Sequence, residues 1–436
     1  MSAVKAERYT AYKDSGVEWL GDVPAHWTEV RIKDLAFLER GKFTHRPRND
    51  PQMYDGPHPF IQTGDVARAN KYVTTYKQSL SDKGTEVSRK FKSGTLLMAI
   101  AANIGDVAIV NFDTYFPDSV VGFTPIKSNT DYLFYLFTAT RSELDRVKVT
   151  STQDNLNLER LNSLVKFSPP LSEQNAIAAY LDTKTAQIDR QINLLGQKAR
   201  QYGKLKQSLI NETVTRGLDK SVPMKDSSVE WIGEVPRHWT VTAITNVTDT
   251  VSHKNHPNEE LLSVYRDYGV IIKSSRDDNN NKAGADLSSY KLVEPGFLVI
   301  NKMKAWQGSL GVSEFRGIVS PAYITCKTNK RIVDRSYLHH LLRCRNYINE
   351  YNRLSFGVRV DQWDMRYDDF KYVPVLLPPM AEQAAIAKYL DEKTAHIDRI
   401  VTAINTQIAK LNDLRKALIN HVVTGKIKVV SEGMVV

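Results

Sequence analysis

Two related stretches decide the fold of this chain: PPLSEQNAIAAYLDTKTAQIDR at residues 169–190 and PPMAEQAAIAKYLDEKTAHIDR at residues 378–399. They align at an offset of 209 and share the Pro-Pro, Glu-Gln, Tyr-Leu-Asp, Lys-Thr-Ala and Ile-Asp-Arg motifs. A match of this length within one chain indicates an internal duplication. A proline disfavours helix at the residue before it, and no further proline follows for more than forty residues. Each proline pair therefore predicts the start of a long helix.

Both predicted helices carry a heptad seam of apolar residues. The seam positions are Leu181, Ile188, Leu195, Tyr202 and Leu209 in the first helix, and Leu390, Ile397, Ile404, Leu411 and Leu418 in the second. Two helices with matched seams most simply pair with each other, and a pseudo-two-fold relation between the copies makes that pair antiparallel. The alternative is that each helix packs on its own module, for which a wider apolar stripe is usual.

A second repeated block, called the leader below, opens each copy. Residues 13–28 return as residues 225–240, at an offset of 212 and with 12 of the 16 positions identical. Between the repeated blocks, residues 29–168 and 241–377 have similar lengths but little obvious identity. The repeated blocks of each copy, residues 13–28 with 169–190 and residues 225–240 with 378–399, are called the frame below. Two similar frames therefore hold two different inserts, which favours a scaffold whose inserts read different targets.

The inserts have the pattern of mixed α/β modules. Apolar runs at residues 94–100 and 105–110 predict two strands joined by a turn, and residues 296–300 and 308–312 repeat this arrangement. Helical spacing follows at residues 132–147 and 337–351.

The predicted fold class is α/β, with two mixed α/β modules separated by two long helices that form an antiparallel coiled coil, and a pseudo-two-fold internal repeat. The boundaries are a first module at 1–168 with its leader at 12–28, a first helix at 169–216, a second module at 217–377 with its leader at 224–240, and a second helix at 378–428.

Composition places the chain among ordinary globular proteins, with 42% hydrophobic and 25% charged residues. No apolar run is long enough for a membrane span, and the first ten residues lack the apolar segment of a secretory signal. The two cysteines, Cys326 and Cys344, form no Cys-x-x-Cys motif, so we expect two buried thiols in a reducing cytoplasm.

The charge balance favours a polyanionic partner. Lys and Arg outnumber Asp and Glu by 59 to 49, and residues 40–92 alone hold 11 basic against 5 acidic side chains.

Searches for catalytic motifs give only near misses. A phosphate-binding Gly-rich loop and a His-Glu-x-x-His zinc motif are absent. Ser168-Pro169-Pro170 is followed by Leu171, where an adenine methyltransferase needs an aromatic residue to grip a flipped base. Pro117-Asp118 has no Asp/Glu-x-Lys on a following strand, as a metal-dependent nuclease requires. We therefore expect no catalytic residue and no metal site in this chain.

Four tryptophans belong to the repeated frame rather than to the inserts: Trp19, Trp27, Trp231 and Trp239. This placement favours buried anchors over base-stacking platforms. His26 and His238, which precede two of them, are expected to be structural as well.

With its doubled Pro-Pro, Glu-Gln and Tyr-Leu-Asp motifs, the chain resembles the specificity subunit of Type I restriction–modification enzymes. The leader GVEWLGDVPAHW at residues 16–27, residues 62–66 (Gln-Thr-Gly-Asp-Val) and residues 103–107 (Asn-Ile-Gly-Asp-Val) are also typical of that family. The resemblance covers essentially the whole chain. The second insert departs from it, because residues 304–309 (Lys-Ala-Trp-Gln-Gly-Ser) replace the Ile-Gly-Asp turn.

The resemblance implies that each insert is a target-recognition domain reading half of a bipartite, asymmetric site in double-stranded DNA. The helices would set the gap between the half-sites and dock two methyltransferase subunits. Those partners would bring S-adenosylmethionine and methylate adenine, motor–nuclease subunits could add cleavage, and this chain would need no cofactor of its own.

Phosphate contacts are expected from Lys and Arg, and base contacts from a few bidentate side chains. The DNA-binding candidates in the first module are Lys42, His45, Arg46, Arg48, Thr63 and Gln153, and those in the second are Lys254, His256, Arg276, Lys302, Lys304 and Arg359.

Two other classes of function stay open at this point. A coiled-coil assembly scaffold that binds no DNA would suit the seams, but it needs neither a basic stretch nor two divergent inserts. An enzyme such as a nuclease is disfavoured by the motif searches. Binding to DNA that weakens steeply with salt separates the first hypothesis from the scaffold.

Overall fold

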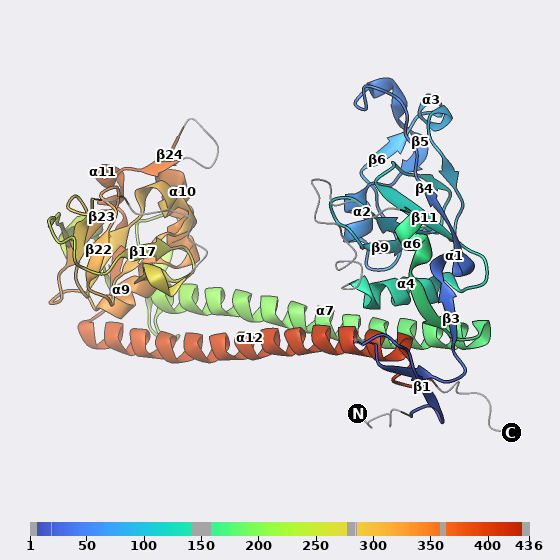
Figure 1. The fold of residues 1–436 in the computed structure, drawn as a ribbon. Coiled ribbons are helices and arrows are strands. Elements are labelled where there is room, and N and C mark those ends of the chain that lie inside the picture. The colour runs from blue at the N-terminus through green and yellow to red at the C-terminus, as the bar shows by residue number, and fades with distance from the viewer. Residues whose placement is uncertain are drawn as a thin grey trace. The chain divides into compact units, whose positions relative to one another are not determined.

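The computed structural model describes residues 7–18, 20–141, 158–276, 284, 286–357 and 363–429. The chain divides into two compact units, Met1–Leu194 with Gln407–Val436, and Leu195–Thr406. The two long helices are α7 (Leu171–Arg216) and α12 (Met380–Val423), and each contributes one part to each unit (Figure 1). Among the helices of the described residues, none is long and apolar enough to cross a membrane.

The first unit begins with a leader in which β1 (Tyr12–Asp14) pairs antiparallel with β2 (Asp22–Pro24). Next, β3 (Thr28–Arg31) pairs antiparallel with β12 (Val165–Ser168), the strand that leads into α7. The module between them has two four-stranded sheets, in the orders β4-β11-β8-β9 and β6-β5-β10-β7. Their strands are β4 (Ala36–Arg40), β5 (Tyr54–Phe60), β6 (Gln78–Leu80), β7 (Lys90–Phe91), β8 (Leu96–Ala99), β9 (Val107–Ile109), β10 (Thr114–Tyr115) and β11 (Val120–Pro125). The helices of the module are α1 (Ile32–Leu35), η1 (Pro51–Met53), α2 (Thr63–Arg68), α3 (Asp82–Glu86), α4 (Thr130–Ala139) and α6 (Leu158–Ser163).

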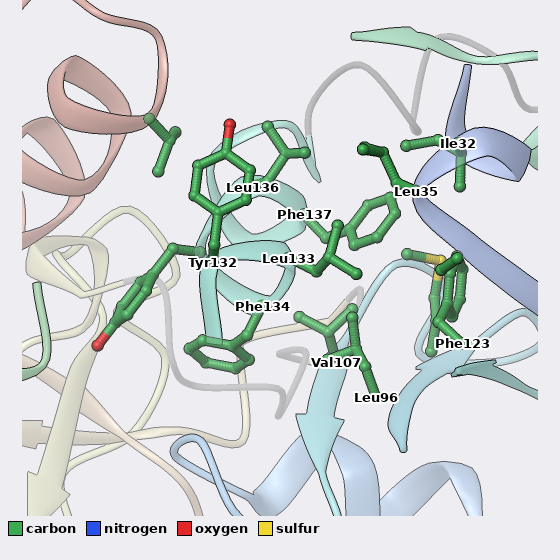
Figure 2. Close-up of a cluster of buried hydrophobic side chains, with 14 of the residues drawn as sticks. Ile32, Leu35, Leu96, Val107, Phe123, Tyr132, Leu133, Phe134, Leu136 and Phe137 are labelled. Atoms are coloured by element: carbon green, nitrogen blue, oxygen red, sulfur yellow. The ribbon is translucent and has the colours of Figure 1, made fainter. Parts of the chain in front are cut away.

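The core of the first unit lies between α4 and the sheet that contains β8. In Figure 2, Leu133 and Phe137 of α4 face Phe123 of β11, and Ile32 and Leu35 of α1 close the cluster. The same cluster reaches the start of α7 and the end of α12, through Ile177, Leu181, Ile419 and Val422. The long helices are therefore part of the module's core rather than a separate stalk.

The second unit repeats this plan. The leader strands β13 (Met224–Asp226) and β14 (Glu234–Pro236) pair antiparallel, as do β15 (Thr240–Ala243) and β26 (Pro374–Leu377) before α12. A four-stranded sheet has the order β16-β23-β20-β21, formed by β16 (Thr248–Thr250), β23 (Ile324–Thr328), β20 (Phe297–Ile300) and β21 (Leu310–Val312). Two-stranded pairs are β17 (Leu262–Tyr265) with β18 (Gly269–Ile272), β19 (Lys291–Val293) with β22 (Gly317–Val319), and β24 (Ser355–Phe356) with β25 (Asp364–Met365). The helices are α8 (Ile244–Val247), η2 (Lys273–Ser275), η3 (Lys302–Gln307), α9 (Arg335–Leu342), α10 (Arg345–Leu354) and α11 (Tyr367–Phe370).

The two inserts share a sheet despite their divergent sequences. The order β4-β11-β8-β9 in the first unit corresponds to β16-β23-β20-β21 in the second, and every neighbouring pair is antiparallel. Both central strands, β8 and β20, are buried at all four positions although their sequences, Leu-Leu-Met-Ala and Phe-Leu-Val-Ile, have only a leucine in common. A protein core tolerates the exchange of one apolar side chain for another when the total volume is kept. The two inserts can therefore form the same sheet although their sequences differ.

One stretch of predicted helical spacing is divided into two helices. Residues 337–351 form two helices, α9 and α10, because the backbone at Cys344 is extended and begins a new helix there. Both cysteines are buried as expected, and burial raises the pKa of Cys326 to about 12 and that of Cys344 to about 11.

The predicted antiparallel pairing of the long helices is confirmed within each unit. In the first, Asp189 of α7 pairs with Arg415 of α12 at 3.1 Å, and in the second Lys206 of α7 pairs with Asp398 of α12 at 2.6 Å. The acids correspond to each other at the offset of 209, and so do the bases.

All ten seam residues lie on these two helices. Leu181, Ile188, Leu390, Ile397 and Ile404 are buried, whereas Leu195, Tyr202, Leu209, Leu411 and Leu418 are half-buried. Leu181 and Leu390 belong to the cores of their own units. Near its start each helix therefore packs on its module, and further along it packs on the other helix, so both packing modes considered from the sequence occur.

Each long helix ends against the leader of the unit that holds its C-terminus. Gly425, after α12, has φ +73°, and a Cβ there would lie 2.3 Å from Cδ of Pro24 and 3.3 Å from Trp27. Gly217, after α7, has φ +76°, and a Cβ there would lie 3.1 Å from Glu382 and 3.3 Å from Trp239. Glycine meets both requirements, the left-handed backbone and the close approach.

We predict that Gly425→Ala destabilises the first unit more than Gly94→Ala does. Gly94 also has a positive φ, +87°, but nothing lies within 4 Å of its notional Cβ. The control substitution costs about 1–2 kcal/mol for the left-handed backbone alone, and the clash at Gly425 adds about 1–3 kcal/mol. Calorimetry of the full chain should show a lower unfolding midpoint for the Gly425 variant, and equal midpoints would contradict the docking described above.

Candidate nucleic-acid interface

The repeated glutamate at the start of each long helix holds the leader in place. In the first unit, Glu173 accepts hydrogen bonds from the indole of Trp27 at 3.1 Å and from Tyr9 at 2.5 Å, and His26 lies 2.8 Å from its second oxygen. Burial and the neighbouring Glu173 carboxylate raise the pKa of the Tyr9 phenol, which therefore stays a donor. One carboxylate thus joins three leader side chains to the helix.

The second unit repeats this clamp with the same geometry. Glu382 accepts from the indole of Trp239 at 3.1 Å, and His238 lies 2.8 Å from its second oxygen. The ammonium groups of Lys13 and Lys225 each donate to the carbonyl of the leader tryptophan at 2.5 Å. The first clamp has one more donor, because the residue that corresponds to Tyr9 at the leader offset is Ser221.

The repeated glutamine fastens the module to the same helix start. The side-chain oxygen of Gln174 accepts from the backbone N–H of Asn129, and that of Gln383 accepts from the N–H of Asp334. Asn129 and Asp334 are the N-cap residues of α4 and α9. Each glutamine also donates to the carbonyl of the first proline of its pair, Pro169 or Pro378. A side chain that binds backbone atoms places no demand on the sequence of the insert.

The repeated aspartate of Tyr-Leu-Asp binds a different module surface in each unit. Asp182 accepts from Tyr135 at 2.6 Å and from Lys71. Asp391 accepts from Ser336 at 3.0 Å and lies 2.7 Å from His340, whose hydrogen bond lowers the pKa of that carboxyl. The frame supplies the same acceptor twice, and each insert supplies its own donors.

The expected role of the frame tryptophans is confirmed for Trp27 and Trp239, which are 1% and 0% exposed. Trp231 is half-buried and packs edge-on against Tyr347 at 4.9 Å. Trp19 lies outside the described residues. Neither of the two buried indoles is available to stack on a base.

The basic stretch at residues 40–92 is partly neutralised by carboxylates from elsewhere in the fold. Six of its eleven cations form ion pairs: Arg48, Arg68, Lys71, Arg89, Lys90 and Lys92. All but one of these have partners outside the stretch, and hydrogen bonds from Lys90 and Lys92 lower the pKa of Asp113 to about 2. The charge count along the sequence therefore overstates the positive charge that the folded surface presents.

Four of the first-module candidates lie on the loop after β4. Lys42, Arg46 and Arg48 are exposed, and His45 is half-buried beside Asp50 at 2.9 Å. Arg48 donates to both oxygens of Asp118, at 3.1 and 3.0 Å, with half of its side chain exposed. These groups are brought together by the structure, and an exposed ion pair of this kind is weak enough to be exchanged for a phosphate.

The other two first-module candidates lie apart from this loop. Thr63 is half-buried at the first position of α2, and Gln153 lies outside the described residues. The buried Asp65 caps α2 by accepting from the N–H of Gln62 at 2.8 Å. The Gln-Thr-Gly-Asp-Val segment thus has a clear structural role as a helix start.

The second-module candidates occupy several loops. Lys254 is exposed and His256 is half-buried on the loop after β16, Lys304 is exposed on η3, and Lys302 pairs with Asp364 at 3.0 Å. The guanidinium of Arg276 lies 4.8 Å from the ring centre of Tyr268 and 5.5 Å from that of Tyr265. Arg359 lies outside the described residues.

A buried cation, Arg343, holds the hairpin that carries these tyrosines, and no motif in the sequence singles it out. It donates to the carbonyls of Arg266 and Leu310, each at 2.8 Å. Burial lowers its pKa to about 10, so it stays charged near neutral pH. The turn between β17 and β18 and the start of β21 are thereby tied together, which keeps the tyrosine–arginine stack in a fixed place.

Within the described ranges, no three His, Cys, Asp or Glu side chains gather as metal ligands would. The site therefore consists of paired and exposed cations, aromatic rings and hydrogen-bonding side chains on two scaffolds of common plan.

Comparison with known proteins agrees with this arrangement. Residues 24–195 match the family model described as the Type I restriction modification DNA specificity domain. The specificity subunit of the EcoKI enzyme of Escherichia coli is 22% identical over 442 residues, covering 93% of this chain and 90% of that protein. That of the MjaVIII enzyme of Methanocaldococcus jannaschii is 22% identical over 436 residues, covering 93% and 94%. The predicted resemblance to Type I specificity subunits is confirmed.

Solved structures support the same fold. The HsdS subunit from Thermoanaerobacter tengcongensis has a TM-score of 0.53 at 16% identity, over 93% of this chain and 98% of that one. A chain from work on complex assembly and conformational transition of the type I R-M system has a TM-score of 0.68 at 15% identity, over 92% and 98%. The similarity to specificity subunits thus spans both units.

One repeated signal of the frame is absent from the motifs identified in the sequence. Leu209-Ile210-Asn211 returns as Leu418-Ile419-Asn420 at the same offset of 209, shortly before the glycine that docks on each leader. Extending the alignment to the ends of the helices would have found it.

We predict that Glu173→Ala loosens only the first leader and that Glu382→Ala loosens only the second. Alanine removes both acceptor oxygens, so the buried indole N–H of Trp27 or Trp239 loses its partner, at a cost of about 1–3 kcal/mol. Hydrogen exchange of the full chain should rise in β1 and β2 in the first variant, with β13 and β14 as the internal control, and the reverse in the second. Unchanged protection in both leaders would show that the clamp is not what holds them.

Proposed function

We propose that this chain is a DNA-specificity subunit in which each module reads one half of a bipartite, asymmetric site in double-stranded DNA. The observation that carries the proposal is the pairing of equivalent frames with different recognition surfaces. The Glu and Gln of the frame make the same contacts in both units, whereas the Asp accepts from different side chains of each insert. Two different readers on one scaffold suit a site with two different halves.

The division of labour in DNA recognition fits these surfaces. Exposed lysines such as Lys42, Lys254 and Lys304 suit phosphate contacts, which position a protein without reading sequence. A guanidinium held over aromatic rings, like that of Arg276, is preorganised for a bidentate contact with a guanine edge. On this proposal the chain supplies recognition and no catalytic group.

The proposal includes partners. The long helices dock two methyltransferase subunits, which bring S-adenosylmethionine and methylate adenine within the recognised site, and motor–nuclease subunits can join the same complex. The helices also set the number of unread base pairs between the half-sites. The chain acts in the cytoplasm, where its DNA and these partners are found.

We predict that co-expression of this chain with its methyltransferase subunit, in a host without adenine methylation, yields one bipartite methylated motif. Single-molecule sequencing of genomic DNA would map methyladenine to two short specific halves around a gap of fixed length. The methyltransferase expressed alone is the control and should leave the DNA unmethylated. A stable complex that methylates no defined motif would contradict the proposal and favour a scaffold that binds only proteins.

A further inference from the structure

The two inserts have an equivalent turn in the sheet that they share. It joins β8 to β9 in the first unit (residues 100–106) and β20 to β21 in the second (residues 301–309). Each turn closes on a glycine with a positive φ, Gly105 at +83° and Gly308 at +90°. The turn therefore belongs to the common plan of the inserts, although its sequence and length differ between them.

This turn lies at the end of the sheet that is remote from the long helix. The β20–β21 turn follows the end of β20, whereas Phe297 at the start of that strand lies opposite Lys327, close to the end of β23. The loop after β23 accepts a hydrogen bond from Gln383 of α12, through the carbonyl of Ile332 at 3.1 Å. The first unit has the same arrangement, since Gln174 of α7 binds the loop after β11.

The loops with most of the candidate cations leave the sheet at the same end as the turn. In the first unit, Gly41 begins such a loop and donates to the carbonyl of Val120, which lies opposite Ala99 at the end of β8. In the second, Val251 begins the corresponding loop and donates to the carbonyl of Thr325, whose strand partner lies near the end of β20. One end of each sheet therefore gathers a divergent turn and a basic loop.

Lysines from three elements converge around the β20–β21 turn. Lys291 of β19 donates to the carbonyl of Tyr323 at 2.6 Å, and the Tyr323 hydroxyl accepts at 3.3 Å from Asn301, the first residue of the turn. Burial and the neighbouring ammonium groups of Lys254 and Lys302 lower the pKa of Lys291. Cations gathered from separate elements in this way favour a polyanion as the partner.

An apolar side chain accompanies these cations. Met303 is 56% exposed, and Lys302 and Lys304 flank it in the sequence. In the same turn, the ring of Trp306 packs against that of Trp363 with their centres 4.9 Å apart, which fixes the turn against the start of β25. A surface that fits a methionine among lysines has an apolar group next to negative charge. The major groove of DNA offers both, in the 5-methyl group of thymine and the phosphates beside it.

We infer that the β20–β21 turn reads one base pair of the second half-site, with Met303 against the 5-methyl group of a thymine and the surrounding lysines on the neighbouring phosphates. The inference rests on the proposed function and adds the element and the contact that determine one position of the site. The equivalent turn of the first unit exposes Ala102 and Asn103 instead, and an asparagine amide suits an adenine edge. The same turn thus reads different bases in the two modules.

The test measures how tightly the full chain, in complex with its methyltransferase subunit, binds duplexes that carry the methylated motif. Each thymine of the second half-site is replaced in turn by deoxyuridine, which lacks only the 5-methyl group. We expect one replacement to weaken wild-type binding about fourfold, as for one methyl group left in water. Met303→Ala should bind the thymine and deoxyuridine duplexes equally. The control Ile332→Ala, which alters a 38% exposed side chain at the opposite end of the sheet, should discriminate as the wild type does.

Two further variants separate the roles within the turn. Met303→Leu keeps an apolar side chain and should retain discrimination, which shows that Met303→Ala loses a contact rather than the fold. Lys304→Ala should also retain discrimination, but it should reduce the slope of log affinity against log salt by about 1, as for one lost phosphate contact.

A wild-type complex that ignores every deoxyuridine, or a Met303→Ala complex that still discriminates, would overturn the inference. Met303→Ala that weakens binding to all duplexes equally, beside a wild type that ignores deoxyuridine, would indicate a wedge between base steps and overturn it as well. In each of these cases a wild-type complex that prefers its motif still supports the proposed function. A wild-type complex that binds its motif no better than a shuffled duplex would instead refute the proposed function itself.

Discussion

The structure depends on a half-buried carboxylate that accepts a hydrogen bond from the indole N–H of the leader tryptophan in each unit. Glu173 and Glu382 stand at the starts of the two long helices, and Trp27 and Trp239 are almost fully buried against them. The glycine that follows the end of the other long helix packs against the same tryptophan in each unit. Leader, helix start and helix end therefore meet at one ring in each unit. Loss of that contact would release all three, because a buried indole N–H without a hydrogen-bond partner is costly.

The frame tolerates different inserts because its hydrogen bonds to them do not require particular residues in the insert. Gln174 and Gln383 bind backbone N–H groups, which any residue provides. Asp182 and Asp391 accept from whichever donors the insert offers, a lysine and a tyrosine in one unit and a serine and a histidine in the other. A scaffold of this kind lets the recognition surface change without a change in the fold, which is the property that a reader of two different half-sites needs.

The fold could be predicted from the sequence because a duplication and a heptad seam are periodic signals. It found the frame residues for the same reason, but not their contacts, since Glu173 lies 146 positions from Trp27. The shared sheet of the inserts stayed hidden because burial preserves apolar character rather than identity, as in β8 and β20. The interface was the hardest part: ion pairs such as Arg48 with Asp118 join distant residues, and no sequence pattern marks Arg343 as the support of a hairpin. Where the candidate side chains meet DNA stays a prediction.

The central claim is that equivalent frames present interchangeable readers. Thr28 lies opposite Ser168, and Thr240 lies opposite Leu377, so the inserts begin and end at matching positions of equivalent strand pairs. The most direct measurement replaces residues 241–377 by a second copy of residues 29–168 and maps methyladenine in cells that also express the methyltransferase. The account predicts a motif in which the first half-site occurs twice and the second has disappeared. Persistence of the second half-site in the methylated motif would contradict it.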